Sequence, residues 1–453
     1  MEKNARLSFS SYIFIGSMLF GLFFGAGNLI FPVHMGQEAG SAFPLATAGF
    51  LTTAIGLPFL GIVGIGVSGS KGLFDLASRV HPAFGYAMTL LLYLTIGPFF
   101  ALPRTATVSY EIGFTPFIPE QLSALGLVCF TILFFAAALF FALRPAKILT
   151  WIGKILNPLF LIFLAVLILV SLVTPMGSTA GAPVQEAYTA TPFFKGFTEG
   201  YNTMDALAAL AFGIIVVQAL RDLGVTSPKG IAAGTLKAGF VSLLLMGVIY
   251  SCLAYIGASS LGKLKLSENG GIALSQIARS YFGNGGEFLL AAIVTLACLK
   301  TAVGLITACS ETFLEIFPGF LNYKIYAVLF TLLSCMIANI GLTQIISYSI
   351  PVLMFLYPLA IALILLALLS PLIKSRRCVY LTTILFTLIP AIADFLNALP
   401  KNITAHPAAQ GILGFAKTAI PFFSIGMGWI VPMLCGLVIG LLISRVKPER
   451  RPA

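Results

Sequence analysis

The stretch of residues 20–34, FGLFFGAGNLIFPVH, restricts the fold of this chain more than any other part of the sequence. It belongs to a long apolar segment and has Gly25, Ala26, Gly27 and Asn28 at its centre. Glycine tolerates backbone angles that break a helix, and asparagine is costly in lipid unless it finds a partner. A helix broken inside a membrane must direct its open N–H and C=O groups toward protein or a water-filled cavity. The stretch therefore indicates either a solute or ion site made by broken backbone, or close helix packing through small residues.

The composition is typical of a membrane protein. Of the 453 residues, 59% are hydrophobic and 9% are charged, whereas soluble domains contain about 25% charged residues. The chain is therefore predicted to be an all-α polytopic membrane protein with a single domain, 1–453. About twelve segments approach the length of about 20 apolar residues that a transmembrane helix needs, and they are 11–34, 42–67, 84–110, 122–142, 150–173, 196–220, 231–257, 287–314, 323–342, 345–369, 379–397 and 420–444.

The net charge of +11 is unevenly distributed along the chain. If the N-terminus lies in the cytoplasm, most of the 26 lysine and arginine residues fall on that side. This asymmetry follows the positive-inside rule, so we expect an inner or plasma membrane protein with both termini in the cytoplasm. It also accounts for the positive charge without nucleic acid as a partner. The cations expected on the outer side are Arg104, Lys195, Lys263, Lys265, Arg279, Lys401 and Lys417, and Lys300 lies within a segment.

The segment 196–220 is predicted to be interrupted as well, because Asn202, Thr203 and Asp205 cluster in it. Asp205 lies about nine residues, or roughly 14 Å, into the membrane at 1.5 Å per residue. A carboxylate at that depth indicates either a functional group or a structural charge pair between two helices. Breaks in the first and sixth segments are expected for a five-plus-five inverted repeat, here 11–173 and 196–369.

Two cations lie in or beside other segments. Arg104 follows Pro98 and Pro103 near the expected outer end of the third segment, where we expect it to anchor the helix at the interface by snorkelling rather than to contact a ligand. Lys300 falls near the centre of 287–314. A lysine there must meet a carboxylate, point into an aqueous cavity or become neutral, and Asp205 is the nearest partner by depth.

Four stretches together carry a resemblance to a known family: FGLFFGAGNLIFPVHMGQEAG at 20–40, GPFFALPRTATVSYEIGF at 97–114, GYNTMDALAALAFG at 200–213 and LACLKTAVGLITACSETF at 296–313. They resemble the bacterial branched-chain amino acid:cation symporters, over about residues 8–445. The resemblance implies uptake of leucine, isoleucine and valine coupled to a Na⁺ or H⁺ gradient. It also implies the LeuT-like fold of the amino acid–polyamine–organocation superfamily, with broken helices 1 and 6 and two additional helices at 379–444.

The resemblance also implies where ligands bind. The substrate carboxylate would meet backbone N–H groups at the start of a half-helix, and the ammonium would meet carbonyl groups near both breaks. The implied substrate residues are Phe23, Ala26, Gly27, Asn28, Thr203, Asp205 and Ala206. An ion such as Na⁺ would be held by oxygen atoms of Gly21, Phe24, Ala297 and Thr301, with Asn28 beside the substrate.

One residue departs from the pattern of related sodium carriers. The position before Thr301 often carries a second hydroxyl group in them, whereas here it is Lys300. An ammonium group in place of sodium would indicate proton coupling, or a fixed charge in a cation-independent exchanger or facilitator. The rival interpretation is that Lys300 points elsewhere and pairs with Asp205.

Other classes of protein fit the sequence less well. A channel needs a continuous pore lined by polar rings, and here isolated polar residues lie on a few segments. An intramembrane enzyme needs a cluster of acid, base or metal-binding groups, whereas the three histidines, His34, His81 and His406, lie in loops or near segment ends. We therefore predict a secondary transporter that works by alternating access, with a small-molecule substrate, the lipid bilayer as partner, and no cofactor beyond a coupling ion.

Overall fold

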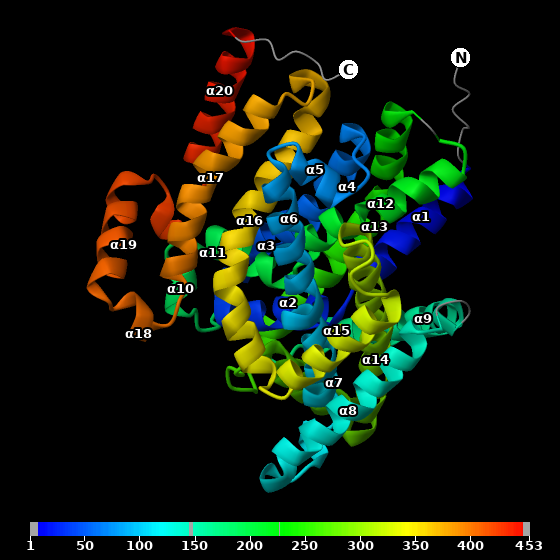
Figure 1. Ribbon diagram of the computed structural model, residues 1–453. Helices are drawn as coiled ribbons and strands as arrows, with labels where there is room; N and C mark the ends of the chain where they lie inside the picture. The colour runs from blue at the N-terminus through cyan, green and yellow to red at the C-terminus, as the bar shows by residue number, and fades with distance from the viewer. Residues whose placement is uncertain (1–7, 145–147, 226, 447–453) are drawn as a thin grey trace.

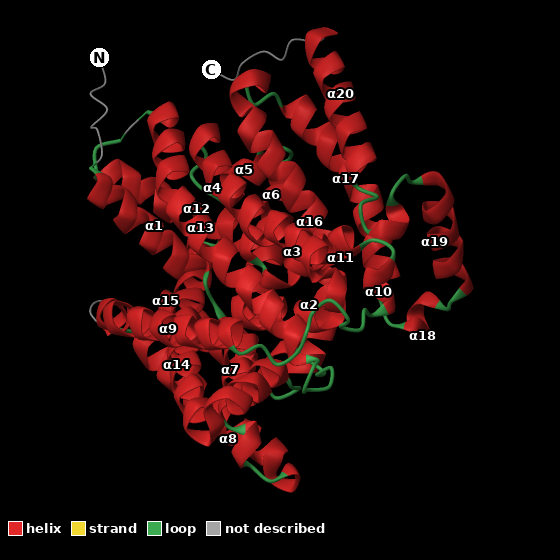
Figure 2. Ribbon diagram, turned by 180° about the vertical axis from the view of Figure 1, so that it is seen from behind, coloured by secondary structure: helices red, strands yellow, loops and turns green. Residues whose placement is uncertain are grey.

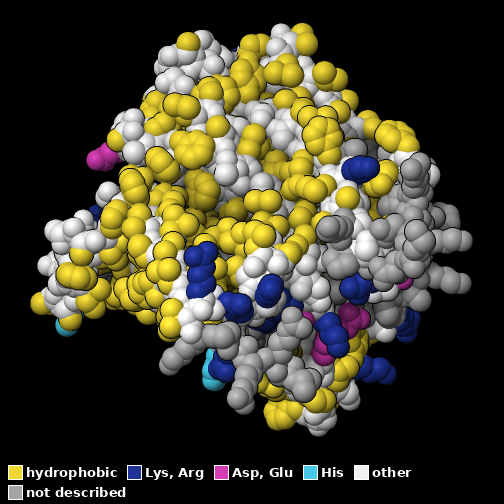
Figure 3. Space-filling model, turned by 90° about the horizontal axis from the view of Figure 1, so that it is seen from above, with side chains coloured by type: hydrophobic (Ala, Val, Ile, Leu, Met, Phe, Trp, Pro, Cys, Tyr) yellow, Lys and Arg dark blue, Asp and Glu magenta, His cyan; other side chains and the backbone are white. Residues whose placement is uncertain are grey.

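The computed structural model describes residues 8–144, 148–225 and 227–446, and every regular element within them is a helix. The helices pack into one bundle whose middle is formed by helices far apart in the sequence (Figure 1). Large apolar side chains remain on its outside, including Leu133, Phe240 and Ile389, which are 71%, 65% and 64% exposed. Figure 3 shows hydrophobic side chains over much of one face, with lysine and arginine gathered in part of it. Such a surface suits a bilayer.

The first segment is broken, as the sequence predicts, but earlier in the chain. Helix α1 (Phe9–Phe23) ends before Phe24, and α2 (Ala26–Ala39) begins after Gly25, which has extended φ and ψ angles of −123° and −165°. The Asn28 side-chain oxygen accepts a hydrogen bond from the Gly25 N–H at 2.9 Å. Because this bond closes the first turn of α2, Gly27 and Asn28 lie inside the helix and the break is at residues 24–25 instead of 25–28.

The interruption in the sixth segment lies where the sequence predicts it. Helix α11 (Pro192–Glu199) passes into a 3₁₀ turn, Gly200–Thr203, and α12 (Asp205–Asp222) begins two residues later. Between them Met204 has a φ of 61°. A side chain larger than glycine rarely takes such a left-handed conformation, so the turn ends one helix before the next begins.

Two further segments contain irregular turns. The second consists of α3 (Phe43–Leu51), a π-helical turn and α4 (Leu57–Ser68). The third consists of α6 (Pro82–Leu94), a π-helical turn that is kinked at Gly97, and α7 (Ala101–Gly113). Pro98 lies in that turn and cannot donate a helical hydrogen bond.

Two long helices cover the broken first segment and α7. Helix α13 (Pro228–Ser260) packs along α2, and α14 (Gly270–Ile316) packs along α7. Gly283, with a φ of 63°, kinks α14. The part of α14 before this kink is an interior element, since Leu274 and Ile277 are completely buried.

The C-terminal helices lie on one side of the bundle. Helix α17 packs against both α16 and α20, and α18 and α19 lie at the edge (Figures 1 and 2). Helix α1 begins and α20 ends on the same side of the molecule. The remaining helices are α5 (Leu73–Ser78), α8 (Ser123–Ala142), α9 (Ile148–Val173), α10 (Glu186–Thr189), α15 (Tyr323–Ala338), α16 (Leu342–Ile373), α17 (Arg377–Asn397), α18 (Lys401–Thr404), α19 (Pro407–Ala419) and α20 (Ile430–Val446).

Every predicted segment contains at least one of these helices. By length and apolar composition, 7 helical stretches in the described part of the chain can cross a membrane. The all-helical membrane fold is therefore confirmed, and the number of twelve spans stays a prediction, as do the bounds of the two repeats.

Small residues set the spacing between α2 and α13. A Cβ atom on Gly36 would lie 2.0 Å from the backbone oxygen of Ala254, and one on Gly257 would lie 2.0 Å from the backbone oxygen of Val33. These distances are far below van der Waals contact, so the two backbones approach as closely as small residues permit.

We expect Gly36→Ala to lower the stability of the folded protein, by about 1–3 kcal/mol or more, because a backbone must move to admit the methyl group. The matched control is Gly304→Ala in α14, where a Cβ atom meets nothing within 4 Å. The measurement is the melting temperature of the detergent-solubilised protein. Equal melting temperatures for the two variants would contradict the predicted close approach.

Candidate functional site

The two broken segments meet at one cavity in the middle of the molecule. The space that is not filled by atoms there is about 540 Å³, which includes space open to solvent. A Cβ atom on Gly27 would lie 3.7 Å from the Thr203 Cα atom, so the first turn of α2 contacts the turn before α12. The cavity is lined by Phe23, Gly25, Ala26, Gly27, Asn28, Ile96, Ala101, Arg104, Thr105, Thr203, Met204, Asp205, Ala208, Phe212, Thr301 and Leu305.

Asn28 joins both breaks to a third helix. Its side-chain nitrogen donates to Asp205 Oδ2 at 2.6 Å and also to the hydroxyl group of Tyr250 in α13. All three side chains are buried. Asp205 is the first residue of α12, where a carboxylate interacts favourably with the positive end of the helix dipole. The three residues therefore hold together the half-helices that begin at the two breaks.

Arg104 is an interior residue, so the prediction of an interfacial anchor is wrong. Its side chain is 3% exposed. Nη1 donates to the Asn202 carbonyl oxygen at 2.6 Å, Nη2 donates to Ser349 Oγ at 3.2 Å, and the guanidinium group lies 5.0 Å from the centre of the Phe31 ring. The reason is that α7 runs through the protein and is buried continuously from residue 102 to residue 110.

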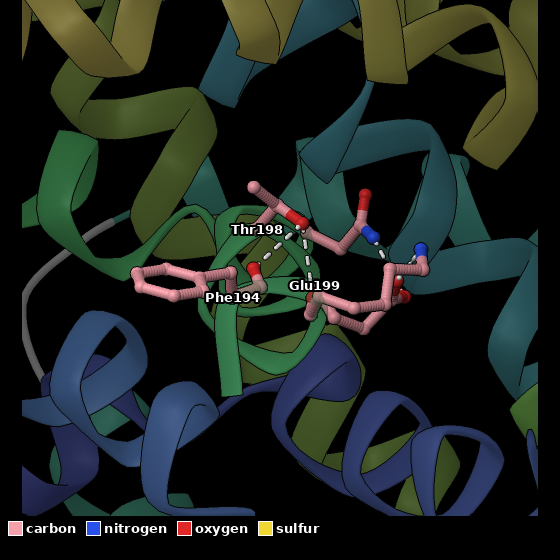
Figure 4. A network of polar contacts seen from close by, with 5 residues as sticks. Phe194, Thr198 and Glu199 are labelled. Atoms are coloured by element: carbon pink, nitrogen blue, oxygen red, sulfur yellow. Dashed lines mark hydrogen bonds and ion pairs between the residues drawn. The ribbon is translucent and has the colours of Figure 1, made fainter. Parts of the chain in front are cut away.

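Polar contacts continue from Asn202 into α11 (Figure 4). Asn202 Nδ2 donates to Glu199 Oε1 at 2.8 Å, and Lys195 Nζ lies 3.0 Å from Glu199 Oε2. The Thr198 hydroxyl group donates to the Phe194 carbonyl oxygen within the same helix. The charge of Glu199 raises the pKa of Lys195, which precedes the membrane segment. A chain of contacts thus leads from a partly exposed ion pair to the break and on to Arg104.

Most of the residues that the resemblance implies for an ion lie around a second cavity, whose space of about 420 Å³ includes space open to solvent. Gly21, Phe24, Ala297 and Thr301 line it together with Lys300. Thr301 donates to the Ala297 carbonyl oxygen at 3.2 Å. Carbonyl and hydroxyl oxygen atoms suit a hard cation, but the lysine brings positive charge into the same space. The two cavities are adjacent, since Gly25, Ala26 and Thr301 line both, whereas Asn28 lines only the central one.

Asp205 and Lys300 line different cavities. The described residues form the ion pairs Lys195–Glu199 and Arg279–Glu287, and neither includes Asp205. Asp205 accepts its hydrogen bond from Asn28.

A larger hollow of about 1510 Å³, which includes space open to solvent, lies beyond the central cavity. Lys71, Asp75, Glu311 and Glu315 are among the residues that line it. Phe212 in α12 lines both this hollow and the central cavity. Phe212 therefore borders both spaces.

The structure brings together most of the substrate residues that the resemblance implies. Phe23, Ala26, Gly27, Asn28, Thr203 and Asp205 line the central cavity, whereas Ala206 is completely buried beside it. Sequence reasoning missed Tyr250, which is one of 14 tyrosines and follows no motif. It also missed the apolar side chains that line the central cavity. For Arg104 a signal existed, because an arginine next to two prolines in an apolar segment is costly unless it is buried with partners.

Solved structures identify the fold of this chain. The chain is similar to the inward-facing conformation of Mhp1, with a TM-score of 0.60 and 15% identity over 96% of this chain and 91% of that chain. It is also similar to MhsT in complex with L-phenylalanine, with a TM-score of 0.51 and 15% identity over 97% of this chain and 99% of that chain. Both likenesses show the LeuT-type transporter fold.

The sequence then defines the family. Residues 8–447 match the family described as branched-chain amino acid transport protein. The chain is 49% identical to the branched-chain amino acid permease BrnQ of Lactobacillus delbrueckii subsp. lactis, over 98% of this chain and 99% of that protein. The chain therefore belongs to the branched-chain amino acid transport protein family. The family and this relative are transport proteins and not enzymes.

We expect Asn28→Ala to destabilise the protein more than Asn322→Ala, which is a matched loss of a capping side chain. Asn322 accepts only from the Ile325 N–H within its own helix, at 3.0 Å, and is exposed. Each change removes a cap, but Asn28→Ala also takes a donor from the buried Asp205 carboxylate, which costs about 1–3 kcal/mol more. Melting of the purified protein measures the difference. Similar melting temperatures for the two variants would mean that the Asn28–Asp205 bond adds little.

Proposed function

We infer that this protein takes up leucine, isoleucine and valine by symport with Na⁺ or H⁺ through alternating access. The observation that carries this proposal is the meeting of both broken segments at one cavity, in a chain of this family. The N–H groups of Ala26, Gly27 and Asn28 are at the start of α2, where the helix has no acceptors for them and its dipole favours an anion. Asp205 contributes a carboxylate for the ammonium group of the substrate.

The rest of the cavity suits a branched aliphatic side chain. Apolar groups from three helices and the π-helical turn before α7 line the same cavity, and they belong to Ile96, Ala101, Ala208, Phe212 and Leu305. Burying an aliphatic side chain against such a wall is favourable by about 25 cal/mol for each Å² removed from water. Because one methylene group changes binding by only about 1–3 kcal/mol, leucine, isoleucine and valine would all be accepted.

The larger hollow is the proposed route to the cytoplasm. It is lined by Lys71, which belongs to the cations placed inside by the positive-inside rule. In this arrangement both termini are cytoplasmic, and the repeats 11–173 and 196–369 move against one another around the central cavity. The helices at 379–444 lie outside this movement.

The second cavity is the proposed place of the coupling charge. Gly21, Phe24, Ala297 and Thr301 provide oxygen atoms for a transported Na⁺, with Asn28 beside the substrate. The alternative function, a cation-independent exchanger or facilitator, is favoured by one observation, namely that Lys300 lines the same cavity. A lysine ammonium group there would replace the ion with a fixed positive charge.

The test is uptake of labelled leucine into proteoliposomes under a Na⁺ gradient or a pH gradient. Symport predicts accumulation above the external concentration under one of them. Uptake that occurs only against internal unlabelled leucine would instead support the exchanger, and uptake that never exceeds equilibrium would support the facilitator. Absence of leucine uptake under all conditions would reject the proposed substrate.

We expect Asp205→Asn to abolish concentrative leucine uptake, because the variant loses the negative charge that faces the substrate ammonium group. The matched control is Asp222→Asn at the other end of α12, where the side chain is exposed. The initial rate and the plateau of uptake are measured for both variants at equal amounts of folded protein. Normal accumulation by Asp205→Asn would show that this carboxylate has only a structural role.

We expect Lys300→Thr to create or strengthen dependence on Na⁺, because the change removes the ammonium group and adds a hydroxyl oxygen next to Thr301. The control is Lys263→Thr, which removes an exposed lysine outside the cavity. Leucine uptake is measured over a range of Na⁺ concentrations at constant ionic strength. An unchanged response to Na⁺ would reject the role of Lys300 as a substitute for an ion.

A further inference from the structure

Arg104 is a buried cation without a carboxylate partner among the residues that the structure describes. The ion pairs of that part of the chain are Lys195–Glu199 and Arg279–Glu287. Arg104 instead contacts a carbonyl oxygen, a hydroxyl group and an aromatic ring. A buried charge is costly unless it is paired, and breaking such a pair is strongly destabilising. The surroundings of Arg104 therefore lack an anion.

The guanidinium group of Arg104 has hydrogen-bond donors that no described protein group accepts. Arginine carries five N–H donors in a fixed planar fork. Two of them are used, on the Asn202 carbonyl oxygen and on Ser349 Oγ. Nε is buried and has no hydrogen-bond partner. Because Arg104 also lines the central cavity, an anion that enters this cavity can reach a cation with open donors.

We propose that Arg104 binds the α-carboxylate of the transported amino acid. This inference rests on the proposed function and adds a residue to the same site. Arg104 and Asp205 line one cavity but form no ion pair with each other. A pair of opposite charges held apart in this way matches the carboxylate and ammonium groups of a zwitterion, while the apolar wall receives the side chain. Arginine is suited to this task because its fork matches the two oxygen atoms of a carboxylate.

The contacts of Arg104 hold it in place for this role. Asn202, which accepts from Nη1, is held by Glu199, and Glu199 is paired with Lys195 (Figure 4). The Phe31 ring and Ser349 come from two other helices. A side chain fixed by several partners keeps its binding geometry before the ligand arrives. The N–H groups at the start of α2 act on the same carboxylate with only a partial positive charge, about half an elementary charge.

The test compares leucine with leucinol, which keeps the ammonium group and the side chain but lacks the carboxylate. Both compete with labelled leucine for uptake by proteoliposomes that contain the full-length protein. We expect leucinol to compete roughly 10- to 100-fold more weakly than leucine in the unchanged protein. In Arg104→Met this ratio should fall to within about threefold of one, and Arg104→Lys should give an intermediate ratio. The matched control is Arg279→Met, since that arginine is 58% exposed, and it should keep the full ratio.

Three results would overturn the proposal. Leucinol that competes as well as leucine in the unchanged protein would show that no carboxylate is recognised, whether or not any variant folds. An Arg104→Met protein that keeps the full ratio would assign recognition to the backbone N–H groups alone. If Arg104→Met does not fold, Arg104→Gln, which also removes the charge, decides, and a full ratio in that variant would likewise assign recognition to the backbone N–H groups alone. Failure of the proposed function is seen separately, as absence of leucine uptake by the unchanged protein.

Discussion

The hydrogen bond from Asn28 to Asp205 is the contact on which the middle of this molecule depends. Two of the predicted membrane segments are interrupted, and an interruption within a membrane leaves backbone groups that lipid cannot satisfy. Asn28 answers part of this need at the first break, because its oxygen accepts from Gly25 while its nitrogen reaches the first residue of α12. One amide group therefore caps one half-helix and positions the other. Tyr250 adds a third helix to the same contact.

Close packing makes that contact reachable. At Gly27 the start of α2 lies against the turn before α12, since a Cβ atom there would be 3.7 Å from the Thr203 Cα atom, which is van der Waals contact. On the other side of α2, Gly36 and Gly257 let α13 approach until backbone meets backbone. In a membrane the helices gain little from the hydrophobic effect when they associate, so close van der Waals contact between backbones carries much of the stability. Different glycines of α2 therefore serve the two uses that the sequence presented as alternatives, because Gly27 lines the cavity and Gly36 permits close packing.

Much of the fold could be predicted from the sequence, because breaks and spans depend on local chemistry. Glycine, asparagine and aspartate within apolar segments marked both interruptions, and each predicted span contains a helix. The residues of the site were harder to predict from local sequence. Arg104 was assigned by its distance along the chain from a segment end, but the kink at Gly97 and the interior course of α7 decide its surroundings. Tyr250 and the apolar wall come from helices whose neighbours only the three-dimensional packing reveals.

The position of Phe212 has a consequence for leakage. Phe212 lines both the central cavity and the larger hollow, so a single residue separates the two spaces at this point. Side chains change rotamer far faster than helical bundles rock, on timescales of about ps–ns when exposed against μs–ms. Such a partition blocks water and small ions only while the neighbouring residues hold the side chain of Phe212 in place. An amino acid in the central cavity would press on the same side chain, so a loaded carrier and an empty one would differ in how well they resist the passage of water and small ions.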